Sequence, residues 1–150
     1  MVSLAEERYT FSSLMTLMIE CESKLHQYYL NASAATSDPQ LASLFADYAK
    51  SISRSVASMQ KARVETIVEM ALEPITNLKL AELMIPIDRG IELGSTGYVS
   101  ALMTIERAVS QLYLQVSQKL ATMSAETGEL LMRLSRDSDE RFHILEQSVS

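Results

Sequence analysis

Apolar and polar residues alternate along four long stretches of the chain, with the three-to-four-residue spacing of a helix that buries one face. On this pattern we expect α-helices over about residues 3–32, 38–72, 98–121 and 124–147. A chain of 150 residues is long enough to bury one core, so these helices predict a single all-α domain over residues 1–150.

Residues that favour helix ends mark the same boundaries. Ser3-Leu4-Ala5-Glu6 has the spacing of a capping box, and Asp38-Pro39 combines an acidic N-cap with a proline at the first helical position. Ser124 is the expected N-cap of the last helix. Most of the few prolines and glycines lie in residues 73–97, around a short apolar piece, Leu78–Ile85, that fits a helical turn or two.

The loop lengths predict how the four helices are connected. The first two helices are separated by a short polar turn, and so are the last two, so each pair must form an antiparallel hairpin. The long connection over residues 73–97 then crosses from one hairpin to the other. We therefore expect a four-helix bundle made of two antiparallel hairpins joined by one long crossover.

Composition and charge narrow the possible partners and locations. A net charge of −6 and a pI near 4.9 disfavour a nucleic-acid partner, which needs a basic surface. No run of about 18 apolar residues predicts a membrane span, and the first residues lack the apolar segment of a secretory signal. The single cysteine, Cys21, excludes an internal disulfide. These features together predict a cytoplasmic protein without a membrane or nucleic-acid partner.

One pattern occurs in both halves of the chain. Glu22 is followed seven residues later by Tyr29, and Glu106 is followed seven residues later by Tyr113. Seven residues are two helical turns, so each tyrosine shares a helix face with its glutamate, at the edge of the apolar stripe. Carboxylate bundles build two-metal sites from one Glu on each of two helices and a Glu-x-x-His on each of the other two. The repeated pattern therefore indicates a carboxylate-bundle ancestry.

The chain resembles the rubrerythrin branch of the ferritin-like family over nearly its whole length. This resemblance implies a ferritin-like bundle, in which one long crossover joins two hairpins, and a di-iron site with Glu22 and Glu106 among its ligands. The family's cysteine-rich rubredoxin domain has no counterpart in this chain. The stretches that carry the resemblance are Ile19-Glu20-Cys21-Glu22 with Tyr28-Tyr29, Leu44-Phe45-Ala46-Asp47-Tyr48-Ala49-Lys50, and Ile105-Glu106-Arg107 with Leu112-Tyr113-Leu114.

The other ligand positions that the resemblance implies are substituted. The Glu-x-x-His of the second helix falls on Ile52 and Ser55, and that of the fourth helix falls on Ser138 and Arg141. Hydrocarbon, neutral hydroxyl and guanidinium groups cannot replace carboxylate and imidazole as iron ligands. The sequence therefore predicts that the di-iron site is degenerate, with no bound cofactor.

The fourth helix also contains one literal Glu-x-x-His, formed by Glu140 and His143. At about 100° per residue, both side chains point away from the centre of that helix's apolar stripe, so we expect both to be solvated. A shifted helical register is the alternative, and it would bring the two residues inward as ligands for iron or another divalent metal.

Arg141 lies on the inward stripe of the last helix, and its role depends on where the carboxylates of Glu22 and Glu106 lie. Glu22 and Glu106 are either boundary residues whose carboxylates reach solvent, or remnant ligands that meet in the interior. Two buried carboxylates repel each other, and the planar guanidinium of Arg141 offers a counter-charge that can hold a carboxylate through two hydrogen bonds. The second arrangement would be an internal Arg–Glu cluster in place of the metal.

Three functions fit these features. The favoured one is a non-catalytic binding or assembly module that has lost its di-iron site, because only two of about six required ligands are present. The alternatives are an unusual carboxylate metalloprotein with peroxidase or ferroxidase-type oxidoreductase activity, and a small-molecule binder that uses the former metal cavity. We also expect a homodimer or larger homo-oligomer, because the crossover is more apolar than a solvated loop requires. Its apolar residues are Leu78, Leu80, Leu83, Met84, Ile85 and Ile87.

Overall fold

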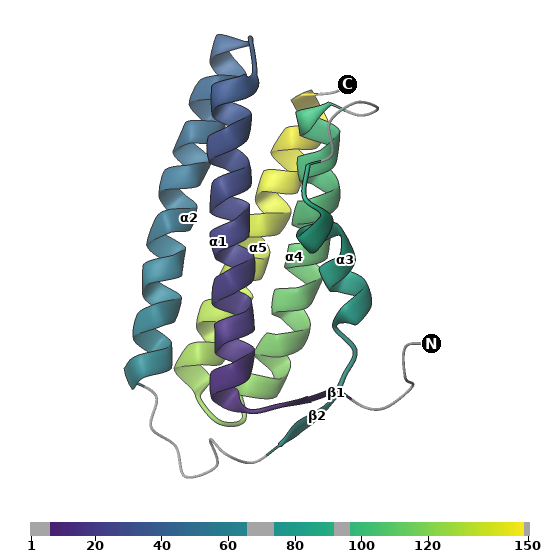
Figure 1. The fold of residues 1–150 in the computed structure, drawn as a ribbon. Helices are drawn as coiled ribbons and strands as arrows, with labels where there is room; N and C mark the ends of the chain where they lie inside the picture. The colour runs from purple at the N-terminus through teal and green to yellow at the C-terminus, as the bar shows by residue number, and fades with distance from the viewer. Residues whose placement is uncertain (1–6, 66–73, 92–96, 149–150) are drawn as a thin grey trace.

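The computed structural model describes residues 7–65, 74–91 and 97–148. Helices account for most of these residues, which confirms the prediction of an all-α protein. None of the helices in the described ranges is long and apolar enough to cross a membrane. Four long helices lie side by side in Figure 1: α1 (Phe11–Ala35), α2 (Pro39–Glu65), α4 (Tyr98–Leu120) and α5 (Ala125–Ser148).

The direction of the chain changes within each pair of helices. In Figure 1, α1 and α5 run upward while α2 and α4 run downward, so α1 is antiparallel to α2 and α4 is antiparallel to α5. Helix α2 ends at the lower end of the molecule, and between α2 and α4 in the sequence the short helix α3 (Ala81–Arg89) lies along α4. Only a few residues separate α1 from α2 and α4 from α5, and a longer stretch of the chain separates α2 from α4.

The first helix starts later than its sequence pattern suggested. Residues Glu7–Tyr9 form strand β1, where the pattern predicted a continuous helix from residue 3. The observed cap of α1 is Thr10, whose hydroxyl accepts the Ser13 N–H at 3.1 Å while the Ser13 hydroxyl accepts the Thr10 N–H at 2.8 Å. The capping box expected at Ser3–Glu6 lies outside the described residues.

The crossover is more ordered than the loop that we expected. Strand β2 (Ile75–Leu78) pairs with β1 in a small antiparallel sheet, and α3 follows where only a turn or two of helix was expected. The Glu7 carboxylate accepts the backbone N–H groups of Leu80 and Ala81 at 3.0 and 3.3 Å, so it neutralises the positive end of α3. This long-range contact fixes the start of the crossover against the beginning of α1.

The remaining boundaries lie close to the expected ones. Helix α4 ends one residue earlier and α5 starts one residue later than the apolar stripes indicated, and the Ser124 hydroxyl accepts the Thr127 N–H at 3.2 Å. The described part of α2 ends at Glu65, so the expected continuation over 66–72 lies outside the described residues.

The apolar residues of the crossover mostly join the protein's own core. Leu78, Leu80 and Ile87 are buried, and among residues 74–91 only Ile85, with 52 % of its surface accessible, is a strongly exposed apolar side chain. The crossover therefore covers the hairpins, and most of the apolar surface that motivated an oligomer is used within one chain.

Candidate functional site

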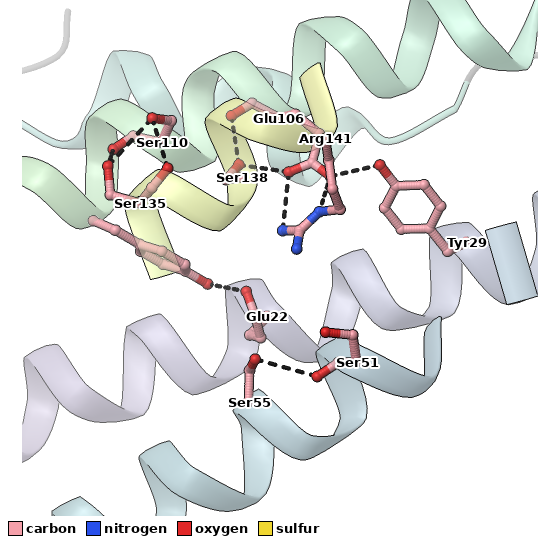
Figure 2. A network of polar contacts seen from close by, with 10 residues as sticks. Glu22, Tyr29, Ser51, Ser55, Glu106, Ser110, Ser135, Ser138 and Arg141 are labelled. Atoms are coloured by element: carbon pink, nitrogen blue, oxygen red, sulfur yellow. Dashed lines mark hydrogen bonds and ion pairs between the residues drawn. The ribbon is translucent and has the colours of Figure 1, made fainter. Parts of the chain in front are cut away.

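Charged and polar side chains meet in the interior between the two hairpins. Glu22 comes from α1, Glu106 from α4, and Ser138 and Arg141 from α5 (Figure 2). The accessible fractions are 1 % for Glu22, 0 % for Glu106 and 6 % for Arg141, so these charges are almost entirely removed from water. Burying charge in this way is costly unless each group has a partner.

Glu106 is the most completely bonded member of this cluster. Arg141 donates from Nε to Glu106 Oε2 at 2.5 Å and from Nη2 to Oε1 at 3.2 Å, which is a two-pronged ion pair. The Ser138 hydroxyl contacts Oε1 at 2.5 Å and the Glu106 backbone carbonyl at 2.9 Å. Burial is the largest single influence on the pKa of Arg141 and lowers it, but the charge of Glu106, its hydrogen bonds and the charge of Glu22 together raise that pKa, so the guanidinium stays charged.

The two tyrosines of the repeated pattern donate to each other's glutamates. Tyr29 on α1 donates to Glu106 Oε2 on α4 at 2.5 Å, and Tyr113 on α4 donates to Glu22 Oε1 on α1 at 2.6 Å. The two bonds cross between the hairpins in opposite directions. Burial, with the neighbouring carboxylates, raises both tyrosine pKa values well above the ordinary range, so both hydroxyls remain donors.

Glu22 lacks the counter-ion that Glu106 has. Within the described ranges, its hydrogen-bond donor is Tyr113, and the guanidinium of Arg141 bonds to Glu106 instead. Burial raises the pKa of Glu22 to about 7, an effect that Arg141 and the Tyr113 hydrogen bond oppose and that Glu106 reinforces. The interior thus holds one fixed ion pair and a second carboxyl group that changes protonation near neutral pH.

The substituted positions of α2 supply no further ligand. Ile52 is fully buried, and its side chain is hydrocarbon only. Ser55 is half-buried, and its hydroxyl donates to the Ser51 carbonyl at 3.2 Å, which Figure 2 shows on the same helix below Glu22. With Ser138 and Arg141 both bonded to Glu106, the four positions do not present the donor set of a di-iron centre.

The literal Glu-x-x-His of α5 lies at the surface. Glu140 is exposed, and the His143 side chain is 59 % accessible with Asp139 and Glu146 each 3.6 Å from its ring nitrogens. The structure does not bring this pair together with Glu22 and Glu106. Across the described ranges, no three His, Cys, Asp or Glu side chains lie close enough together to hold a metal ion.

Several polar contacts of the interior were not expected from the sequence. Ser110 on α4 and Ser135 on α5 exchange hydrogen bonds, with the Ser135 hydroxyl 2.8 Å from the Ser110 carbonyl (Figure 2). Ser138 bonds to Glu106, although the sequence suggested only that it could not ligate iron. Serines within an otherwise apolar stripe were the available signal. The Tyr48 hydroxyl is buried and has no hydrogen-bond partner among the described residues.

Comparison of the chain with protein-family models, with curated proteins and with solved structures finds no match.

Proposed function

We propose that this chain is a rubrerythrin-like member of the ferritin-like superfamily in which an internal Arg–Glu cluster has replaced the di-iron site. Its function is then that of a non-catalytic binding or assembly module. The observation that carries this proposal is the two-pronged contact of Arg141 with Glu106 in the interior between the hairpins. The order of helix directions, with one long crossover between two hairpins, is the ferritin-like one and supports the same assignment.

The chemistry of the cluster opposes metal binding. A divalent cation that approached Glu106 would be repelled by the guanidinium of Arg141 in surroundings that screen charge poorly. Glu22 and Glu106 are two carboxylates where a di-iron centre needs about six protein ligands. The residues present therefore do not fit the metal centre that the resemblance implies, and no redox or oxygen chemistry is assigned to them.

The first part of the test measures metal content. We expect protein purified without an affinity tag or chelator to contain iron, zinc and manganese at far below one ion per chain, by inductively coupled plasma mass spectrometry. Soaking with ferrous iron under argon, followed by desalting, should leave this content unchanged. Stoichiometric iron in the native protein would contradict the proposal and favour the oxidoreductase alternative.

The second part tests Arg141 as the counter-charge. The Arg141→Leu substitution leaves Glu106 and Glu22 buried without a cation, so we expect a loss of on the order of 3–5 kcal/mol in the free energy of unfolding at neutral pH. The loss should shrink in acid, where Glu22 is protonated and no longer needs a counter-charge. Arg136→Leu, at an exposed position of the same helix, is the matched control. If both variants unfold at the same urea concentration as the wild type, Arg141 is not the counter-charge.

A further inference from the structure

A groove of about 540 Å³ lies on the side of the molecule formed by α3, α4 and α5. Its apolar lining comes from all three helices, with Leu83 and Pro86 on α3, Met103 and Ala108 on α4, and Phe142 on α5. The groove is open to solvent and is distinct from the buried charge cluster, whose members do not line it. Its size and mostly apolar lining are within the range of surface pockets that bind another molecule.

Two charges of opposite sign line the groove. Glu82 belongs to the first turn of α3 and Arg107 to the middle of α4. Neither side chain has an ion-pair partner in the part of the chain that the structure describes. The guanidinium carbon of Arg107 lies 4.7 Å from the centre of the Phe142 ring, and this cation–π contact holds the positive charge against the apolar lining.

The helix that forms one side of the groove also carries an exposed apolar side chain. Ile85 has 52 % of its surface accessible and lies three residues after Glu82, so both side chains share one side of α3. A short helix with an exposed isoleucine and an unpaired carboxylate matches a groove with an apolar lining and an unpaired guanidinium. The same chain supplies both surfaces.

We propose that this groove is the interface through which two copies of the chain form a dimer. In this arrangement α3 of each copy lies over the groove of the other, with Ile85 against the apolar lining and Glu82 paired with Arg107 of the second copy. A two-fold axis makes each contact twice, which is the usual symmetry of a homodimer. A second copy is the occupant because it brings a carboxylate for Arg107 and an exposed isoleucine for the apolar lining on one helix. The inference supplies the partner for the assembly role proposed above and rests on that role.

Sedimentation velocity of the full chain, over about 1 to 100 µM, tests the dimer. We expect the wild type to dimerise, and both Arg107→Glu and Glu82→Arg to raise the dimer dissociation constant by at least about tenfold, since each places like charges opposite each other twice. The double variant restores opposite charges in reversed order and should regain most of the lost affinity. Arg136→Glu and Glu129→Arg on α5 make the same charge changes at exposed positions outside the groove and should have no effect.

Three results would overturn the dimer: a monomer at the highest concentration, a dimer insensitive to both single reversals, or a double variant no better than the single ones. Far-ultraviolet circular dichroism of each variant checks that the helices are retained. Failure of this inference and failure of the proposed function are distinguishable, because metal content and the stability of Arg141→Leu do not depend on Glu82 or Arg107.

Discussion

Among the described residues, the buried cluster has fewer cationic groups than carboxyl groups. One guanidinium faces two carboxyl groups, and its geometry satisfies only one of them, Glu106. Ionising the second, Glu22, leaves a buried negative charge supported by a single tyrosine hydroxyl. This imbalance explains why the pKa of Glu22 rises to about 7, with burial as the largest cause.

The protonation of Glu22 predicts a specific dependence of stability on pH. The carboxyl group loses its proton near pH 4.5 in the unfolded chain but only near pH 7 in the folded protein, so its contribution to stability is lost as the pH rises between these values. Glu22→Gln keeps a hydrogen-bond acceptor for Tyr113 and removes the charge. We expect this variant to gain about 3 kcal/mol relative to the wild type between about pH 4.5 and 8, measured by urea unfolding.

Glu20→Gln is the matched control for this experiment, because it removes an exposed carboxylate from the same helix. Its stability relative to the wild type should vary little over the same pH range. A Glu22→Gln variant whose relative stability is constant from pH 5 to 8 would show that Glu22 is already ionised in the folded protein at about pH 5.

At the level of single residues, the helical period predicted part of the cluster. It indicated that Glu22, Glu106 and Arg141 could share the interior, because the angular position of each residue on its helix follows from the sequence alone. The exchange of partners between Tyr29 and Tyr113 was not predicted. It depends on the spacing and relative height of α1 and α4, which no local pattern encodes.

At the level of elements, the turn between α4 and α5 depends on a glycine. Gly128 is buried in the first turn of α5, and a Cβ atom there would lie 2.7 Å from the Cβ and 2.8 Å from the Cα of Ala121. Alanine is intrinsically better than glycine in a helix by about 1 kcal/mol, but overpacking against backbone costs about 1–3 kcal/mol. We therefore expect Gly128→Ala to lower the thermal midpoint and the free energy of unfolding.

Gly97→Ala provides the control for the glycine prediction. A Cβ at Gly97 would meet no atom of the described residues within 4 Å, and its φ of −69° suits any residue. The loss of a glycine N-cap and the lower entropy of the unfolded chain nearly cancel, so its stability should stay within about 0.5 kcal/mol of the wild type. Equal stabilities of the two variants would mean that the turn adjusts to the added methyl group.

The helices were predictable where an apolar stripe continues over many consecutive residues. The stripes of α4 and α5 cover more than six helical turns each, and their observed ends lie within one residue of the expected ends. The strands β1 and β2 have three and four residues and lie far apart in the chain. Their pairing and the contact of Glu7 with the start of α3 join residues about 70 positions apart, and sequence periodicity cannot reveal contacts of that kind.

At the level of the whole molecule, the buried cluster links the two hairpins. Helices pack most extensively within each hairpin, α1 against α2 and α4 against α5, and the backbones of the two hairpins approach each other at fewer places. Two hydrogen bonds, Tyr29–Glu106 and Tyr113–Glu22, join one hairpin to the other. The apolar side chains around the cluster belong to the same core. Polar groups that are satisfied only in one register specify how the hairpins dock more than they add stability.

The two crossing tyrosines should therefore differ in importance. Tyr29→Phe leaves Glu106 bonded to Arg141 and Ser138, so we expect a loss of about 1 kcal/mol that is the same at about pH 5 and 8. Tyr113→Phe removes the hydroxyl that supports Glu22, and the loss should reach about 2–3 kcal/mol at about pH 8, where Glu22 is ionised. At about pH 5, with Glu22 protonated, this loss should fall to about 1 kcal/mol.

Urea unfolding of both variants at the two pH values, alone and combined with Glu22→Gln, measures the coupling between Tyr113 and Glu22. A pH-independent loss for Tyr113→Phe would contradict the assignment of the changing charge to Glu22. Additive losses for Tyr113→Phe and Glu22→Gln at about pH 8 would show that the bond between the hairpins contributes no coupling energy.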